Sequence, residues 1–193
     1  MICSLIFLAL GLSRGQSDVL VVPGYTAYGA PDHDKLRVSS TGTGSWTSTN
    51  QTIQWHGMLN DGDLTPTINV YLPEGQTAHM RIFVGPQQAV DRSIGENSGG
   101  FVTFAQESQA VVTGQGDQMV SVTFPGVTIA QPGYETICLQ GTFASGGSLP
   151  DVESITLRGK AVAGAHFNMK ERRNTASVHL HYPFAKDTQV AWF

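Results

Sequence analysis

The chain has 193 residues, of which 13% are charged, and its formal net charge at pH 7 is −4. This length suffices for one domain with a sizeable core, and the charged fraction is about half of the roughly 25% usual in soluble proteins. The composition therefore excludes a coiled coil and argues against a disordered tail. The sequence also lacks the basic stripe that nucleic-acid binding needs.

An apolar run opens the chain at residues 2–12, and the small residues Ser13 and Gly15 follow it. The run is too short to cross about 30 Å of hydrocarbon as a helix. It predicts a secretory signal peptide over residues 1–15, and hence a secreted protein, extracellular or periplasmic. The alternatives are a misplaced start and a buried first strand. No other segment approaches the ~18 continuous apolar residues of a membrane helix, so we expect no membrane span.

Short β-branched or aromatic runs, separated by Gly, Pro, Asn and Asp, fill residues 18–160. This pattern predicts an all-β domain, a two-sheet antiparallel β-sandwich. Polar and apolar residues alternate at 67–72 and 152–158, which predicts one buried and one solvent-exposed face for each strand. The predicted strands are Val19 to Val22, Leu36 to Thr41, Thr52 to His56, Thr67 to Leu72, Ala78 to Val84, Phe101 to Phe104, Ala110 to Thr113, Gln118 to Phe124, Tyr134 to Phe143 and Val152 to Arg158.

The cysteines predict no internal disulfide. Cys3 lies inside the predicted signal peptide, so the mature chain would keep only Cys138. Cys138 falls in an alternating strand pattern with no matching histidine, and we interpret it as an inert, small side chain rather than a nucleophile.

The segment 161–193 differs from the rest of the chain. A connector of small residues leads to a basic cluster around Arg172 and Arg173, then to an alternating strand at 177–182, and the chain ends on an apolar stretch at 190–193. Exposed apolar edges promote association. We therefore expect either a connector to a further C-terminal domain or an end that pairs back onto the sandwich.

A set of short motifs runs through the second half of the chain. They are Trp55, Val70-Tyr71-Leu72, Gly133-Tyr134, Leu139-Gln140-Gly141, Asp151-Val152, Ile155 to Gly159, Arg172-Arg173, Ser177-Val178-His179-Leu180 and Tyr182-Pro183. Together they resemble the bacterial domain of unknown function 5077, whose members are similar to galactose-binding-like carbohydrate-binding modules of jelly-roll architecture. The resemblance implies that Arg172, Arg173, His179 and Tyr182 form a family tail motif. It also implies that a second domain, of unknown function 3472, follows.

Aromatic residues in loops are the candidates for sugar binding, because a pyranose offers an apolar face to a ring and its hydroxyls to polar side chains. Trp46 lies in a polar loop with Asn50, and Tyr25 and Tyr28 lie in a loop flanked by Gly and Pro. These four residues are the predicted carbohydrate-binding set. The alternative is that each aromatic ring caps a sheet end. Trp55, inside a strand, is predicted to be core.

The sequence predicts no cofactor, although a structural calcium ion is a candidate. Asp61 and Asp63 lie in a turn and could supply carboxylate oxygens, but their spacing is not that of an EF-hand loop. The alternative interpretation is a plain turn.

Three functions remain open after these exclusions. The first is a secreted, non-catalytic module that binds a glycan or polysaccharide as part of a larger protein. The second is an accessory part of a polysaccharide-active hydrolase whose chemistry lies elsewhere. The third is a structural or adhesion spacer without a small ligand. The sequence has no Gly-x-Ser-x-Gly elbow, phosphate loop or His-Glu-x-x-His motif, so we predict no catalytic residue in this chain.

Overall fold

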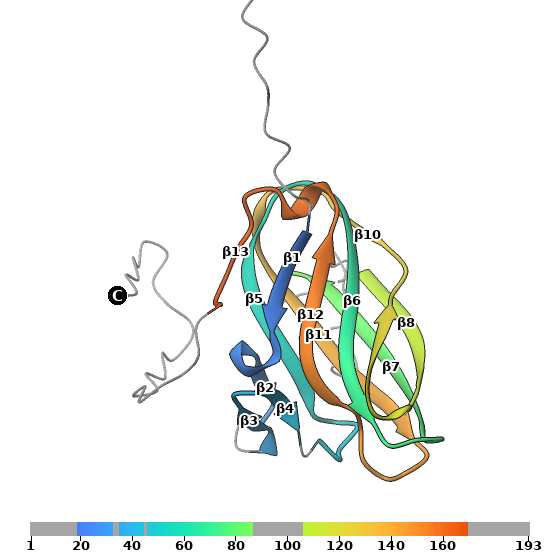
Figure 1. Ribbon diagram of the computed structural model, residues 1–193. Coiled ribbons are helices and arrows are strands. Elements are labelled where there is room, and N and C mark those ends of the chain that lie inside the picture. The colour runs from blue at the N-terminus through green and yellow to red at the C-terminus, as the bar shows by residue number, and fades with distance from the viewer. Residues whose placement is uncertain (1–18, 33–34, 45, 87–105, 170–193) are drawn as a thin grey trace, which may run out of the picture.

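The structure is a computed structural model that describes residues 19–32, 35–44, 46–86 and 106–169. Two antiparallel sheets, of seven and six strands, face each other as a β-sandwich (Figure 1). The all-β, two-sheet prediction is therefore confirmed. No helix in the described ranges is both long and apolar enough to span a membrane.

The first sheet has the order β10-β6-β12-β4-β3, with β1 also paired to β12 and β9 to β6. Its longest strand, β6, pairs with β12 over most of its length. The bounds are β1 Val19–Pro23, β3 Arg37–Ser39, β4 Gly42–Gly44, β6 Gly62–Leu72, β9 Gly116–Thr123, β10 Val127–Ile129 and β12 Asp151–Arg158.

The second sheet has the order β13-β5-β11-β7-β8, with β2 also paired to β5. Two short 3-10 helices, η1 at Gly24–Thr26 and η3 at Lys160–Val162, follow β1 and β12. The bounds are β2 Tyr28–Ala30, β5 Thr52–Leu59, β7 Thr77–Gly85, β8 Gln106–Thr113, β11 Gly133–Ala144 and β13 His166–Phe167.

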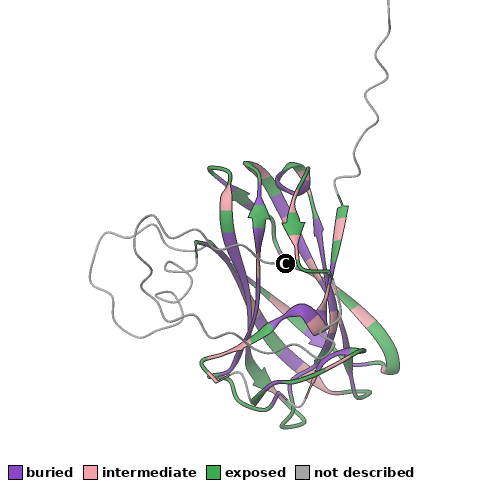
Figure 2. Ribbon diagram, turned by 90° about the vertical axis from the view of Figure 1, so that its left-hand side faces the viewer, coloured by how far each residue is buried: buried purple, intermediate pink, exposed green. Residues whose placement is uncertain are grey.

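The core lies between the sheets because side chains alternate along each strand. In β6, Ile68 and Val70 are fully buried, while Tyr71 is exposed. Buried residues follow the middle of the strands, and exposed residues gather in the connections at both ends (Figure 2). The alternation predicted for this strand is confirmed.

The outer face of β12 is more buried than the alternation of its polar and apolar residues predicts. Ser154 and Thr156 are buried, and the amide of Asn69 on β6 donates to their hydroxyls at 2.9 and 3.2 Å. Ser121 on β9 donates in turn to the side-chain carbonyl of Asn69 at 2.7 Å. A row of hydrogen-bonded polar side chains thus crosses three strands, buried on β12 and exposed at Ser121.

Most predicted strands match observed ones, with bounds that differ by a few residues. Leu36 to Thr41 was predicted as one longer strand, but only Arg37–Ser39 is β3. The structure adds β2, β4, β10 and β13, each of three residues or fewer. Predicted strands at 101–104 and 177–182 lie outside the described residues.

The sandwich extends past the boundary at residue 160 that the sequence predicts, since β13 pairs with β5. The predicted signal peptide at 1–15 and the part of the predicted tail beyond residue 169 lie outside the described residues. Cys138 is fully buried in β11, which fits its interpretation as a small packing side chain.

Candidate functional site

The edge of the second sheet has a gap beside β5. The short strand β2 pairs with residues 52–54 of β5, and β13 pairs with residues 57–58 on the same side. Trp55 and His56 lie between these two paired stretches. Figure 1 shows β13 above β2 on that side of the sandwich. The gap therefore opens the edge of the sandwich at the middle of β5.

A pocket of about 260 Å³ occupies this gap, and we call it the edge pocket. Its floor is apolar, since Val22 is fully buried and Trp55 is 1% exposed. Two tyrosines at its rim are open to solvent, Tyr28 at 49% and Tyr134 at 74% exposure. The lining residues are Val22, Thr26, Tyr28, Trp55, His56, Tyr134, Phe167 and Asn168.

Two local features of the sequence build the floor and wall of the edge pocket. Gly57 has no side chain, and a Cβ there would lie 2.5 Å from the ring of Phe167. This glycine therefore lets Phe167, on β13, pack against β5. On the other side, the indole Nε1 of Trp55 donates to the carbonyl oxygen of Pro23 at 3.3 Å, which ties β5 to the end of β1.

His56 is the polar group nearest the middle of the gap. Its Nδ1 lies 3.0 Å from the hydroxyl of Thr136, and its ring centroid lies 5.8 Å from that of Tyr28. Burial lowers the pKa of the His56 imidazole below its ordinary value, because a charged ring would lose hydration. The imidazole is therefore neutral at pH 7 and can exchange hydrogen bonds with an uncharged partner.

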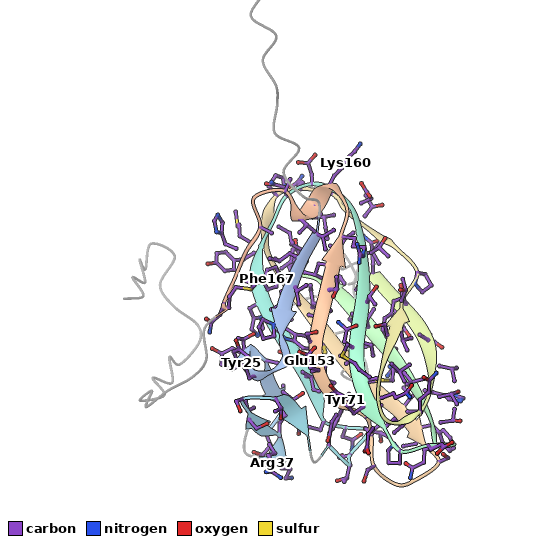
Figure 3. All side chains as sticks on the ribbon, viewed as in Figure 1. Tyr25, Arg37, Tyr71, Glu153, Lys160 and Phe167 are labelled. Atoms are coloured by element: carbon purple, nitrogen blue, oxygen red, sulfur yellow. The ribbon has the colours of Figure 1, made fainter. Side chains whose placement is uncertain are left out.

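A second pocket, of about 210 Å³, lies beside the β3–β4 hairpin, and we call it the polar pocket. Its lining includes one guanidinium, from Arg37, and two carboxylates, from Asp151 and Glu153. Tyr71 contributes the aromatic ring and is 40% exposed. Figure 3 places Tyr71 and Glu153 near each other, with Arg37 below them. This pocket differs from the edge pocket mainly in its charge.

The structure corrects the prediction that Trp46 is a sugar platform. Its ring is 1% exposed and belongs to the core, and its Nε1 donates to the carbonyl oxygen of Gln51 at 2.9 Å. A buried indole offers no free face to a sugar. Asn50, by contrast, is exposed in a turn, where its backbone N–H donates to the hydroxyl of Ser48.

The two predicted tyrosines lie on the side of the sandwich that carries the edge pocket. Tyr28 lines the pocket, whereas the Tyr25 hydroxyl donates to the carbonyl oxygen of Met169 at 3.2 Å. Tyr25 and Phe167 both lie on this side in Figure 3. The prediction that Trp55 is core is confirmed. The family tail residues Arg172, Arg173, His179 and Tyr182 lie outside the described residues.

Of the candidate calcium residues, Asp61 lies in the connection from β5 to β6, and Asp63 is the second residue of β6. One carboxylate oxygen of Asp63 accepts from the backbone N–H of Lys160 at 3.4 Å, and Asp61 is exposed. Among the residues that the structure describes, no three His, Cys, Asp or Glu side chains gather in one group that could hold a metal ion.

Sequence reasoning missed Tyr134, His56, Phe167 and Asn168 as site residues. Tyr134 carried a usable signal, because it directly follows the turn residues Pro132 and Gly133 and is therefore placed near a sheet end.

Glu135, next to Tyr134 on β11, gives a prediction about stability. It is 8% exposed, and no residue that the structure describes gives its Oε2 a hydrogen bond. Burial raises its pKa above the ordinary value, so folding favours the protonated form. This contribution to stability is present below the unfolded-state pKa and is lost as pH rises through the folded-state pKa.

We expect Glu135→Gln to remove that loss. The free energy of unfolding of the variant, relative to that of the parent, should be larger at pH 8 than at pH 4. Urea unfolding of both proteins at the two pH values measures this difference. Glu74→Gln, in an exposed turn, is the control. An equal difference at both pH values would show that the Glu135 charge does not oppose folding.

Comparison with known proteins gives a family and a fold. The family model described as "Domain of unknown function (DUF5077)" matches residues 21–162. No curated protein matches the sequence.

Two solved structures are similar to this chain. The CBM36-1 domain of a multidomain xylanase from the hindgut metagenome of Trinervitermes trinervoides aligns with a TM-score of 0.51 and 12% identity, over 73% of this chain and 97% of that one. A family 35 carbohydrate binding module from Clostridium thermocellum aligns with a TM-score of 0.46 and 14% identity, over 72% and 96%. At 12% identity, the first likeness establishes the β-sandwich fold alone.

Proposed function

We propose, because the chain belongs to the DUF5077 family and has the β-sandwich fold of a carbohydrate-binding module, that it is a secreted, non-catalytic glycan-binding module of a larger extracellular protein. The edge pocket carries this proposal. The signal-like run at 2–12 supports secretion.

The edge pocket combines the two features that sugar binding requires. Tyr28 and Tyr134 present aromatic surface at its rim, where the apolar face of a pyranose can stack. His56, Thr26 and Asn168 bring polar groups to the same lining, where sugar hydroxyls can exchange hydrogen bonds. Aromatic surface around a few polar groups is the arrangement that suits a neutral, hydroxyl-rich ligand.

The lining of this pocket also supports binding rather than hydrolysis. Glycoside hydrolysis uses two carboxyl groups, one as acid and one as base or nucleophile. The described residues that line the edge pocket include no Asp or Glu. A sugar held there would meet aromatic rings, hydroxyls, an amide and an imidazole, but no carboxylic acid to protonate a leaving group.

Removing the Tyr134 ring should weaken glycan binding. We expect Tyr134→Ala to weaken binding at least about tenfold, since an aromatic contact with a ligand ring is worth on the order of 1 kcal/mol or more beyond buried area. The measurement is binding of the full chain to a glycan array, followed by calorimetric titration of the strongest glycan. Phe143→Ala is the matched control, because Phe143 is a 49% exposed aromatic residue on the same strand.

Tyr71→Ala separates the two pockets. If the edge pocket holds the glycan, this change in the polar pocket leaves binding at the parental level. Binding that is lost in Tyr71→Ala and retained in Tyr134→Ala would move the site to the polar pocket. If the folded parent binds no glycan on a broad array, the result would favour the spacer function.

A further inference from the structure

We infer that the edge pocket takes one uncharged pyranose unit and discriminates against sugars that carry a carboxylate or an amine. This inference rests on the proposed function and names the class of sugar that the same pocket accepts. It depends on three properties of the pocket: its volume, the charge of its lining and the placement of its aromatic rings.

The volume of the edge pocket limits its occupant to one ring. Pockets that bury drug-sized ligands enclose about 300–1,000 Å³. The edge pocket, at about 260 Å³, falls below that range. Its length along the sheet edge is limited as well, because β2 and β13 close it at residues 54 and 57 of β5. A longer glycan would therefore place one unit in the pocket and the remainder outside.

Among the residues that the structure describes, those lining the pocket carry no formal charge at pH 7. They include no Asp, Glu, Lys or Arg, and burial keeps the imidazole of His56 neutral. A carboxylate or ammonium that entered would lose hydration without gaining an ionic partner. This loss should lower the affinity at least about tenfold, which corresponds to about 1.4 kcal/mol. Hydroxyl groups lose less hydration free energy on entry, and the lining presents the polar side chains of His56, Thr26 and Asn168 to them.

The contrast with the polar pocket strengthens this argument. The polar pocket has nearly the same size but places Arg37 near Asp151 and Glu153. A charged sugar would find opposite charges there and none in the edge pocket.

The aromatic rings favour a pyranose with an extended apolar face. Tyr134 is the most exposed large hydrophobic residue among those that the structure describes, and it lies at the pocket rim. Phe167 forms a wall, and the buried Trp55 closes the floor. A flat ring that enters against Phe167 can stack on Tyr134 while its hydroxyls reach His56.

Matched sugars test the inference directly. We would titrate the full chain at pH 7 and constant ionic strength with glucose, glucuronic acid and glucosamine, and with galactose, galacturonic acid and galactosamine, at millimolar concentrations. The parent should bind a neutral sugar at least about tenfold more tightly than its two charged partners. Tyr134→Ala should remove that binding, and Phe143→Ala should retain it.

An added charge in the pocket tests the cause of the preference. Asn168→Asp places a carboxylate in the lining without a change of size, and it should shift the preference toward the amino sugars. A charged sugar that binds the parent as tightly as the neutral one, and loses binding in Tyr134→Ala, would overturn this inference while the glycan-binding function stands. Absence of binding by all six sugars and by the glycan array would overturn the proposed function itself.

Discussion

Replacing Trp46 by alanine is expected to lower the free energy of unfolding by about 3–5 kcal/mol. The indole is 1% exposed, so its loss leaves a cavity in the core between the sheets. The carbonyl oxygen of Gln51 also loses the donor that now lies 2.9 Å away. Because this effect is on stability, any glycan binding should persist under conditions in which the variant is folded.

Urea unfolding followed by circular dichroism measures this change. Trp46→Phe is the matched control, since it keeps an aromatic ring in the core. It leaves a smaller cavity than alanine and removes the hydrogen bond, at a cost of about 1–3 kcal/mol for the carbonyl left unsatisfied. Parental stability in Trp46→Ala, together with loss of glycan binding, would contradict the buried position and restore Trp46 as a sugar platform.

Gly42→Ala should cost a similar amount, about 3 kcal/mol or more. Gly42 begins β4 with a φ of 129°, a conformation that residues with a side chain rarely adopt. A Cβ there would lie 2.2 Å from the backbone oxygen of Val152 on β12. The variant must therefore separate β4 from β12 or distort both strands, which would also open the polar pocket.

Gly75→Ala is the matched control for this effect. Gly75 also has a positive φ, 73°, but no atom of the described residues lies within 4 Å of the position that a Cβ would take. It should cost only the backbone penalty of about 1–2 kcal/mol. Thermal unfolding of both variants compares them, and equal costs would show that contact with Val152 does not decide the effect at Gly42.

The sequence predicted the sandwich because long strands carry their own signal. In β6, apolar side chains recur at every second position over much of the strand, and this period specifies one buried face. Strands of two or three residues contain no such period. β2 and β13 could therefore not be predicted, and the edge pocket exists only because these two strands leave part of β5 uncovered.

The site residues show the same limit. Trp46 and Tyr28 both looked like exposed loop aromatics, yet the Trp46 ring is buried while Tyr28 is 49% exposed. The difference depends on tertiary packing: the loop of Trp46 folds against the core, where the Trp46 carbonyl oxygen accepts from the distant Leu149 backbone at 2.9 Å. The sequence shows which aromatic residues lie in loops, but it does not show whether their rings are buried or exposed to solvent.

The position of a bound sugar tests the central claim most directly. We would titrate the isotope-labelled full chain with methyl glucoside, methyl galactoside and methyl xyloside in turn and follow the protein signals by nuclear magnetic resonance. The account predicts that the largest shifts belong to Tyr28, His56, Tyr134 and Phe167, around the edge pocket. Shifts confined to Arg37, Tyr71 and Asp151 around the polar pocket, or no shift with any sugar, would contradict it.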